Sequence, residues 1–221
     1  MLLSNVYSEI KKEYYKNGTL KQVTPYNKTK KNGKEKHYYK DGKLAAIVPY
    51  KNGEIVGTGI TYYPNGNLQS ETPVSKGEAN GLAILYFPNG NIQREIPYEN
   101  GKINGTAKTY FKDKTLRSVT TFKNDLQNGK YSHYYENGCK MSEGQSLKNR
   151  ITGELKIYYP CNNSHRFNLN DMDSFNKYSN GGINYLITFK NGKAIKGVSF
   201  NENGGKSKMT NAHLHNMGFE F

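Results

Sequence analysis

The sequence predicts an all-β fold, in which a single layer of antiparallel β-hairpins stacks into a repeat solenoid with divergent terminal caps. Three observations support this prediction. A tyrosine recurs every 24 residues, a turn dipeptide follows it, and a glycine closes each unit. One hairpin of this length cannot bury its own apolar face, so neighbouring hairpins must pack side by side.

Each unit opens with a tyrosine and then turns. The opening residues are Tyr14, Tyr38, Tyr62, Tyr86, Tyr110, Tyr134 and Tyr158. The turn dipeptides are Asn17-Gly18, Asp41-Gly42, Asn65-Gly66, Asn89-Gly90, Asn137-Gly138 and, as the one departure, Asp113-Lys114. Asn-Gly between apolar runs is typical of a type I′ turn, whose two central residues both have positive φ. We therefore expect type I′ turns at these positions.

The fourth unit sets the expected strand register. Counting outward from Asn89-Gly90, the expected facing pairs are Phe87 with Ile92, Tyr86 with Gln93, Ala83 with Ile96, and Gly81 with Tyr98. Side chains alternate between the two faces of a strand, so Gly81, Ala83, Phe87, Ile92, Ile96 and Tyr98 share one face. We expect that face to be packed, because it holds the aliphatic residues and the glycines. The opening tyrosines then lie on the opposite face, and Tyr98 to Gly105 is expected to be a loop.

The period also divides the chain. We expect an N-terminal cap over residues 1–13, tandem repeats over 14–160, and a divergent C-terminal segment over 161–221. Within that segment, residues 183–189 alternate and Asn191-Gly192 follows, which predicts one more hairpin. No stretch approaches the ~20 apolar residues of a membrane span. The first residues turn polar too soon for a signal peptide.

Composition and charge narrow the possible partners. The chain has 19 Tyr, 9 Phe and no Trp in 221 residues, and this aromatic content argues against disorder. The formal net charge is +14, and the only arginines are Arg94, Arg117, Arg150 and Arg166. Specific nucleic-acid recognition favours arginine, so the lysine excess disfavours it. Attraction to anionic membrane or glycan surfaces stays open.

The unit Tyr62-Tyr63-Pro64-Asn65-Gly66-Asn67-Leu68, closed by Asn80-Gly81, resembles the bacterial MORN-repeat variant. The same repeat occurs in proteins of the YwqK-type antitoxin family, and the resemblance covers residues 14–160. It implies MORN-type hairpins that act as scaffolds and as protein-binding or membrane-associated modules, often in envelope or secreted proteins. The antitoxin family would imply neutralising a partner toxin by binding it. The repeat brings no catalytic motif with it.

Few residues outside the repeat pattern suggest chemistry. On a strand, His213 and His215 would place two imidazoles on one face, but a metal site needs three or four ligands. Asp171 and Asp173 lack the glycine and distal glutamate of a calcium loop. Cys139 and Cys161 fall near the turns of neighbouring units, and a disulfide would need their Cα atoms within ~7 Å, which the sequence leaves open. We expect no metal, no cofactor and no enzyme activity.

The remaining candidate site is a ladder of tyrosines with a lysine rim. The ladder residues are Tyr38, Tyr62, Tyr86 and Tyr110, and the rim residues are Lys40, Lys108, Lys112 and Lys130. One interpretation is that the rings only stack along the solenoid. The other is a binding surface, since interface hot spots are rich in aromatic residues. We predict a non-enzymatic scaffold that binds a protein partner; the alternative is electrostatic binding to anionic membrane or glycan surfaces.

Overall fold

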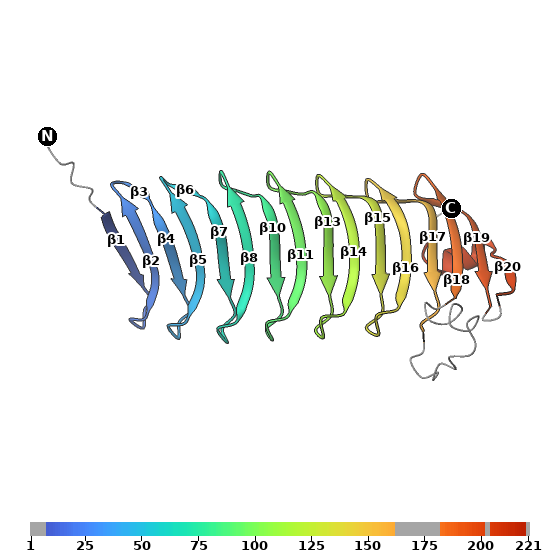
Figure 1. Ribbon diagram of the computed structural model, residues 1–221, viewed down its shortest axis with the longest axis horizontal. Helices are drawn as coiled ribbons and strands as arrows, with labels where there is room; N and C mark the ends of the chain where they lie inside the picture. Colours follow the sequence, from blue (N-terminus) through green and yellow to red (C-terminus); the bar gives the residue numbers. More distant parts are fainter. Residues whose placement is uncertain (1–7, 162–181, 202–203, 220–221) are drawn as a thin grey trace, which may run out of the picture. The chain divides into compact units, whose positions relative to one another are not determined.

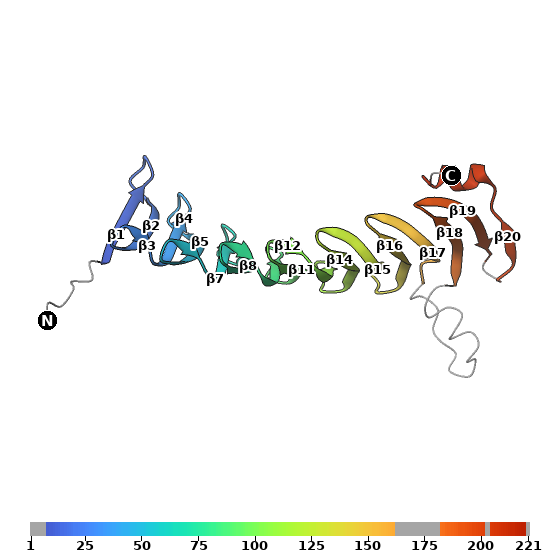
Figure 2. The same cartoon turned by 90° about the horizontal axis from the view of Figure 1, so that it is seen from above.

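The computed structural model describes residues 8–161, 182–201 and 204–219, and antiparallel β-strands dominate it (Figure 1). The chain forms two compact units, Met1–Ile103 and Asn104–Phe221. Within each unit the strands lie side by side in chain order and form one layer (Figures 1 and 2). The expected all-β architecture of antiparallel hairpins is confirmed.

The first unit alternates long strands with two-residue strands. Its strands are β1 (Ser8–Tyr14), β2 (Leu20–Asn27), β3 (Lys30–Lys31), β4 (Gly33–Tyr38), β5 (Leu44–Lys51), β6 (Glu54–Ile55), β7 (Gly57–Tyr62), β8 (Leu68–Ser75), β9 (Glu78–Ala79), β10 (Gly81–Tyr86), β11 (Ile92–Glu99) and β12 (Lys102–Ile103). Each short strand folds back on the long strand before it, as β9 does on β8. The next long strand then pairs with that same strand, as β10 does with β8.

The second unit continues this pattern and then departs from it. Its elements are β13 (Gly105–Tyr110), β14 (Leu116–Lys123), β15 (Leu126–Tyr134), β16 (Lys140–Leu147), β17 (Arg150–Tyr158), β18 (Ile183–Lys190), β19 (Lys193–Phe200), β20 (Lys206–Lys208) and α2 (Asn211–Asn216). The late hairpin expected around Asn191-Gly192 is present as β18 and β19. The short helix α2 is not among the elements that the sequence predicted.

The Asn-Gly turns are not type I′, so that expectation is wrong. Asn89 keeps a negative φ, and only Gly90, at φ 87°, takes the left-handed conformation. Phe87 accepts a hydrogen bond from the Gly90 amide at 2.8 Å, and its own amide donates to the Asn91 carbonyl at 2.8 Å. This is a type I turn followed by a glycine bulge, the usual geometry of a three-residue hairpin loop.

Type I′ turns lie instead at the opposite end of the strands. Both central residues have positive φ at Asn52-Gly53, Lys76-Gly77 and Asn100-Gly101. The expected loop from Tyr98 to Gly105 is therefore wrong, since it contains this turn between β11 and β12. The turn glycine also links neighbouring 24-residue repeats, because the Gly101 amide donates to the Ala79 carbonyl at 2.9 Å.

The register of the fourth unit is partly as expected. Gly81 faces Tyr98 and Ala83 faces Ile96, which confirms two pairs. A bulge after Leu85 shifts the remainder, so Tyr86 faces Ile92 and not Gln93. Phe87 consequently lies opposite Asn91. The bulge recurs at the same position in the other hairpins, for example between Thr61 and Tyr62.

The closing glycine is required by a close approach. Gly81 has φ 119°, a conformation that residues with a side chain rarely adopt. A Cβ atom at this position would lie 3.1 Å from the Pro73 Cβ in the same 24-residue unit. Gly33 and Pro25 repeat the relation, with a Cβ-to-Cγ separation of 2.9 Å. The glycine and the proline of each unit are therefore one packing device.

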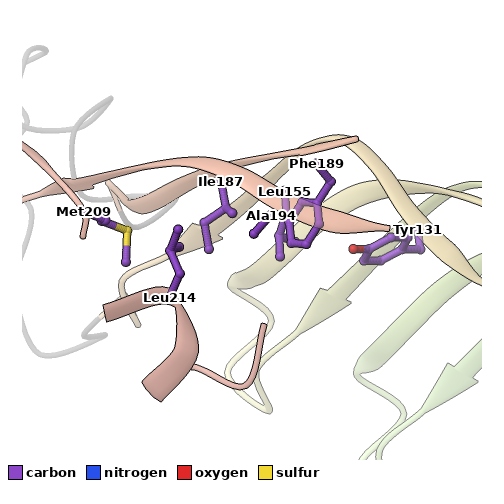
Figure 3. Close-up of a cluster of buried hydrophobic side chains, with 7 residues drawn as sticks. All are labelled: Tyr131, Leu155, Ile187, Phe189, Ala194, Met209 and Leu214. Carbon is purple, nitrogen blue, oxygen red and sulfur yellow. The ribbon is translucent and has the colours of Figure 1, made fainter. Parts of the chain in front are cut away.

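Burial falls on the expected packed face. Ala83, on that face of the first unit, is only 2% exposed. The second unit holds a larger core, in which Leu155 and Ile187 from β17 and β18 meet Leu214 from α2 (Figure 3). Gly197 allows this approach, because a Cβ there would lie 2.9 Å from the Leu214 Cδ2. The helix thus caps the packed face of these strands.

Candidate binding surface

The ladder tyrosines end the first strand of each hairpin. Tyr38, Tyr62 and Tyr86 are the last residues of β4, β7 and β10 in the first unit, and Tyr110 ends β13 in the second. Strand alternation places them opposite the packed face. We call this side the tyrosine face: the face of each unit that carries its opening tyrosines.

The ladder rings are partly buried, but direct stacking does not explain their spacing. Equivalent tyrosines in the first unit, such as Tyr62 and Tyr86, stand two strands apart in the sheet. At ~4.8 Å per strand this separates them by roughly 10 Å. Interacting aromatic rings have centroids within ~7 Å. Other side chains must therefore fill the space between successive rings.

Glutamates occupy some of that space. The Tyr86 hydroxyl donates to the Glu71 Oε2 at 2.7 Å. Burial and this hydrogen bond raise the pKa of Tyr86 to about 12. Tyr158 donates to the Glu143 Oε1 in the same way at 2.7 Å, and burial together with the bond raises its pKa. Each partner precedes its tyrosine by 15 residues, so neither pair stands out as a sequence motif.

Apolar rows run beside the tyrosines in the first unit. Ile47 and Ile60 face each other, and Ile84 takes the equivalent position one 24-residue repeat later. Leu82, on the same face of β10, is 47% exposed. Pro73 faces Thr58 on this side of the sheet. The tyrosine face of the first unit therefore combines aromatic, aliphatic and proline side chains that are only partly covered.

The candidate lysines lie in two kinds of place: two are in turns and two are on strands of the tyrosine face. Lys40 is exposed in the turn after Tyr38, and Lys112 is exposed in the turn after Tyr110. Lys108 and Lys130 stand on the tyrosine face of β13 and β15. Lys108, Lys112, Lys130 and Tyr110 all belong to the second unit, whereas Lys40 belongs to the first.

The packed face also carries a buried carboxylate that the sequence did not predict. Glu35 is 3% exposed and accepts hydrogen bonds from Lys31 at 2.6 Å, Thr24 at 2.8 Å and His37 Nε2 at 3.0 Å. Burial alone would raise the pKa of Glu35, but these hydrogen bonds hold it below its ordinary value. Buried charges need such partners, so removing one of them would leave the Glu35 carboxylate without compensation.

Two expectations about single residues are now resolved. Cys139 and Cys161 form a disulfide, with Cα atoms 6.1 Å apart. His213 and His215 lie on α2 and not on a strand, so the expectation of a strand pair is wrong. Two residues along a helix differ by roughly 200° in direction, so the imidazoles point to different sides.

The described residues contain no group of three or more His, Cys, Asp or Glu that could hold a metal ion. Asp171 and Asp173 lie outside the described residues. Helices long and apolar enough to span a membrane are absent from the part of the chain that the structure describes.

Comparison with known proteins gives one family model and a set of distantly similar solved structures, two of which follow. The model of the MORN repeat variant matches residues 10–28, 31–52, 55–76, 79–100 and 103–124. A solved structure of TcdB2-TccC3-TEV is 13% identical over 86% of this chain but only 12% of its own length, with a TM-score of 0.25. A porin-like protein from Bacteroides uniformis ATCC 8492 is 14% identical over 91% of this chain and 87% of its own, with a TM-score of 0.23. The curated proteins include no match.

Proposed function

Because residues 10–124 carry five MORN-variant repeats, and such repeats generally mediate protein or membrane binding, we propose that this chain is a non-enzymatic scaffold for a protein partner. The proposed contact surface is the tyrosine face. It includes the ladder Tyr38, Tyr62, Tyr86 and Tyr110 and the rim Lys40, Lys108, Lys112 and Lys130.

One observation carries this proposal. In the first unit the same aromatic and aliphatic rows recur at 24-residue spacing, and the exposed Leu82 stands among them. A few residues carry most of the binding energy in protein interfaces; tyrosine is enriched among them, and the apolar contacts around them exclude water. A regular row of such residues suits a partner that lies along several hairpins.

The test is affinity capture with a matched control. Immobilised wild-type protein is compared with Leu82→Glu and with Ile195→Glu, an isoleucine that is 60% exposed at the bulge of β19, beyond the last opening tyrosine. Bound proteins are washed in about 1 M salt, where the Debye length is about 3 Å. We expect wild type and Ile195→Glu to retain the same discrete protein and Leu82→Glu to lose it. Equal retention by all three would contradict the proposal.

A second candidate is association with an anionic membrane or glycan surface, favoured by the net charge of +14. Its test is cosedimentation with vesicles of phosphatidylcholine, with and without phosphatidylserine. If the protein binds only the anionic vesicles and is released as the salt concentration rises, its function is electrostatic binding to an anionic membrane. No binding to either vesicle would remove the membrane as a partner.

Finer features of the proposal rest on the resemblance to the YwqK-type antitoxin family. They are a toxin as the partner and a secreted or envelope location in a bacterium. The disulfide supports an oxidising compartment, where such bonds persist. The division into residues 1–13, 14–160 and 161–221 is part of the same proposal.

A further inference from the structure

The second unit has a hollow on its tyrosine face that the repeat pattern does not explain. The hollow has a volume of about 430 Å³ and lies between β15, β16 and β17. Six polar side chains of its lining alternate along these strands on one face, namely Lys130, Ser132, Glu143, Gln145, Glu154 and Lys156. The lining therefore consists largely of groups that form hydrogen bonds.

Departures from the repeat create this hollow. Ser132 stands where the four earlier repeats have larger side chains, at multiples of 24 residues before it: Lys36, Ile60, Ile84 and Lys108. Gln145 stands, by the same spacing, where earlier repeats have Pro49 and Pro73. A small side chain and a polar one thus replace larger or apolar residues at one place.

The charges in the hollow balance. Lys130 and Lys156 oppose Glu143 and Glu154, although the whole chain carries +14. Glu143 is already engaged, because it accepts from Tyr158 at 2.7 Å and from Lys140 at 2.8 Å. This site is therefore not a concentrated part of the basic surface.

The remaining polar groups of the hollow are open to a ligand. Among the described residues, the side chains of Lys130, Ser132, Gln145 and Glu154 have no hydrogen-bond or ion-pair partner. Lysine only donates, an ionised glutamate only accepts, and serine and glutamine do both. A ligand that satisfies all four must donate and accept at closely spaced positions.

We propose that this hollow binds a neutral saccharide of one or two rings. Sugar hydroxyls both donate and accept, which matches the four open groups. The two glutamates of the lining disfavour an anion such as phosphate. The volume lies within the ~300–1,000 Å³ typical of small-molecule sites. The proposal does not rest on the protein-binding function of the tyrosine face.

The test is a titration of the ¹⁵N-labelled full chain with N-acetylglucosamine and with cellobiose at millimolar concentration. The amide signals of Gly144 and Gly153, which also line the hollow, report binding there. We expect both signals to shift and saturate in the wild type. No saturable shift with either sugar would overturn the proposal, as would a larger response to inorganic phosphate.

Two variants and one control separate a site from a structural effect. Ser132→Ile restores the residue of earlier units and fills the hollow, so it should abolish the shifts. Glu154→Gln keeps the shape of the hollow and should preserve the fold, so it serves as the test if Ser132→Ile does not fold. It should weaken sugar binding about tenfold, because the carboxylate acceptor is lost. Thr106→Leu introduces the Leu82 residue at the equivalent position outside the hollow and should bind as the wild type does. Wild-type affinity in a folded Ser132→Ile or in Glu154→Gln would refute the site.

Discussion

At the residue scale, the Asn-Gly dipeptide separates into two roles. In the six turns, the side chain of the first residue accepts a hydrogen bond from the amide two residues later; these acceptors are Asn17, Asp41, Asn65, Asn89, Asp113 and Asn137. The second residue supplies a left-handed backbone. The fifth unit keeps the first role and loses the second, because Lys114 has φ 78° without being glycine.

This exception predicts a stabilising substitution. Lys114→Gly should raise the free energy of unfolding by about 1 kcal/mol, because glycine relieves the left-handed strain and gives back only part of it as chain entropy. Urea denaturation measures the change. Gly90→Lys, the reverse change one unit earlier, should lower stability by a similar amount. An unchanged midpoint for both variants would show that the turn backbone is not strained.

At the element scale, the second aromatic of each unit links neighbouring hairpins. The Tyr15 hydroxyl donates to the Tyr38 carbonyl at 2.7 Å, and Tyr63 donates to the Tyr86 carbonyl at 2.7 Å. The sequence showed a recurrent aromatic pair but not that its two members have different contacts. The first tyrosine faces the surface and the second joins two units, a difference that depends on the bulge before the turn.

Removing one such link should destabilise the first unit. We expect Tyr63→Phe to lower the free energy of unfolding by about 1 kcal/mol, since the partly buried Tyr86 carbonyl loses its donor. Tyr14→Phe is the control, because Tyr14 is 58% exposed and, within the described residues, its hydroxyl has no hydrogen-bond partner. Thermal unfolding of both variants gives the comparison. Equal stability would mean that water replaces the lost donor.

At the scale of the whole molecule, its two units differ in how they are stabilised. The first relies on repeated turns, glycine–proline contacts and the hydrogen bonds between hairpins. The second adds an apolar core under α2 and the disulfide between Cys139 and Cys161. The Asn137 side chain reinforces this closure by donating to the Cys161 carbonyl at 2.8 Å.

The disulfide should contribute measurably to the second unit. Its cysteines are 22 residues apart, and closing a loop of that length stabilises a fold by about 3 kcal/mol. In urea denaturation, the free energy of unfolding of the double variant Cys139→Ser, Cys161→Ser should be lower than that of the wild type by that amount. Reductant should destabilise the wild type to the same level and leave the double variant unchanged. Two free thiols in the oxidised wild type would exclude the bond.

The sequence by itself determined the period, the hairpins, the positions of the turns after the opening tyrosines and the packed face. These features are local: side chains alternate along a strand, and a turn depends on a few adjacent residues. The ladder tyrosines could be found in this way, because they recur at constant spacing.

Only the tertiary structure decided the disulfide, the helix over the core, the glutamate partners of the tyrosines and the polar hollow. Each depends on residues that are distant along the chain, such as Glu71 with Tyr86 or Leu155 with Leu214. The strand expected at His213 became a helix because Thr210 caps it and Leu214 is buried against the sheet. Such contacts leave no periodic trace in the sequence, because their energy comes from burial and hydrogen bonding across the fold.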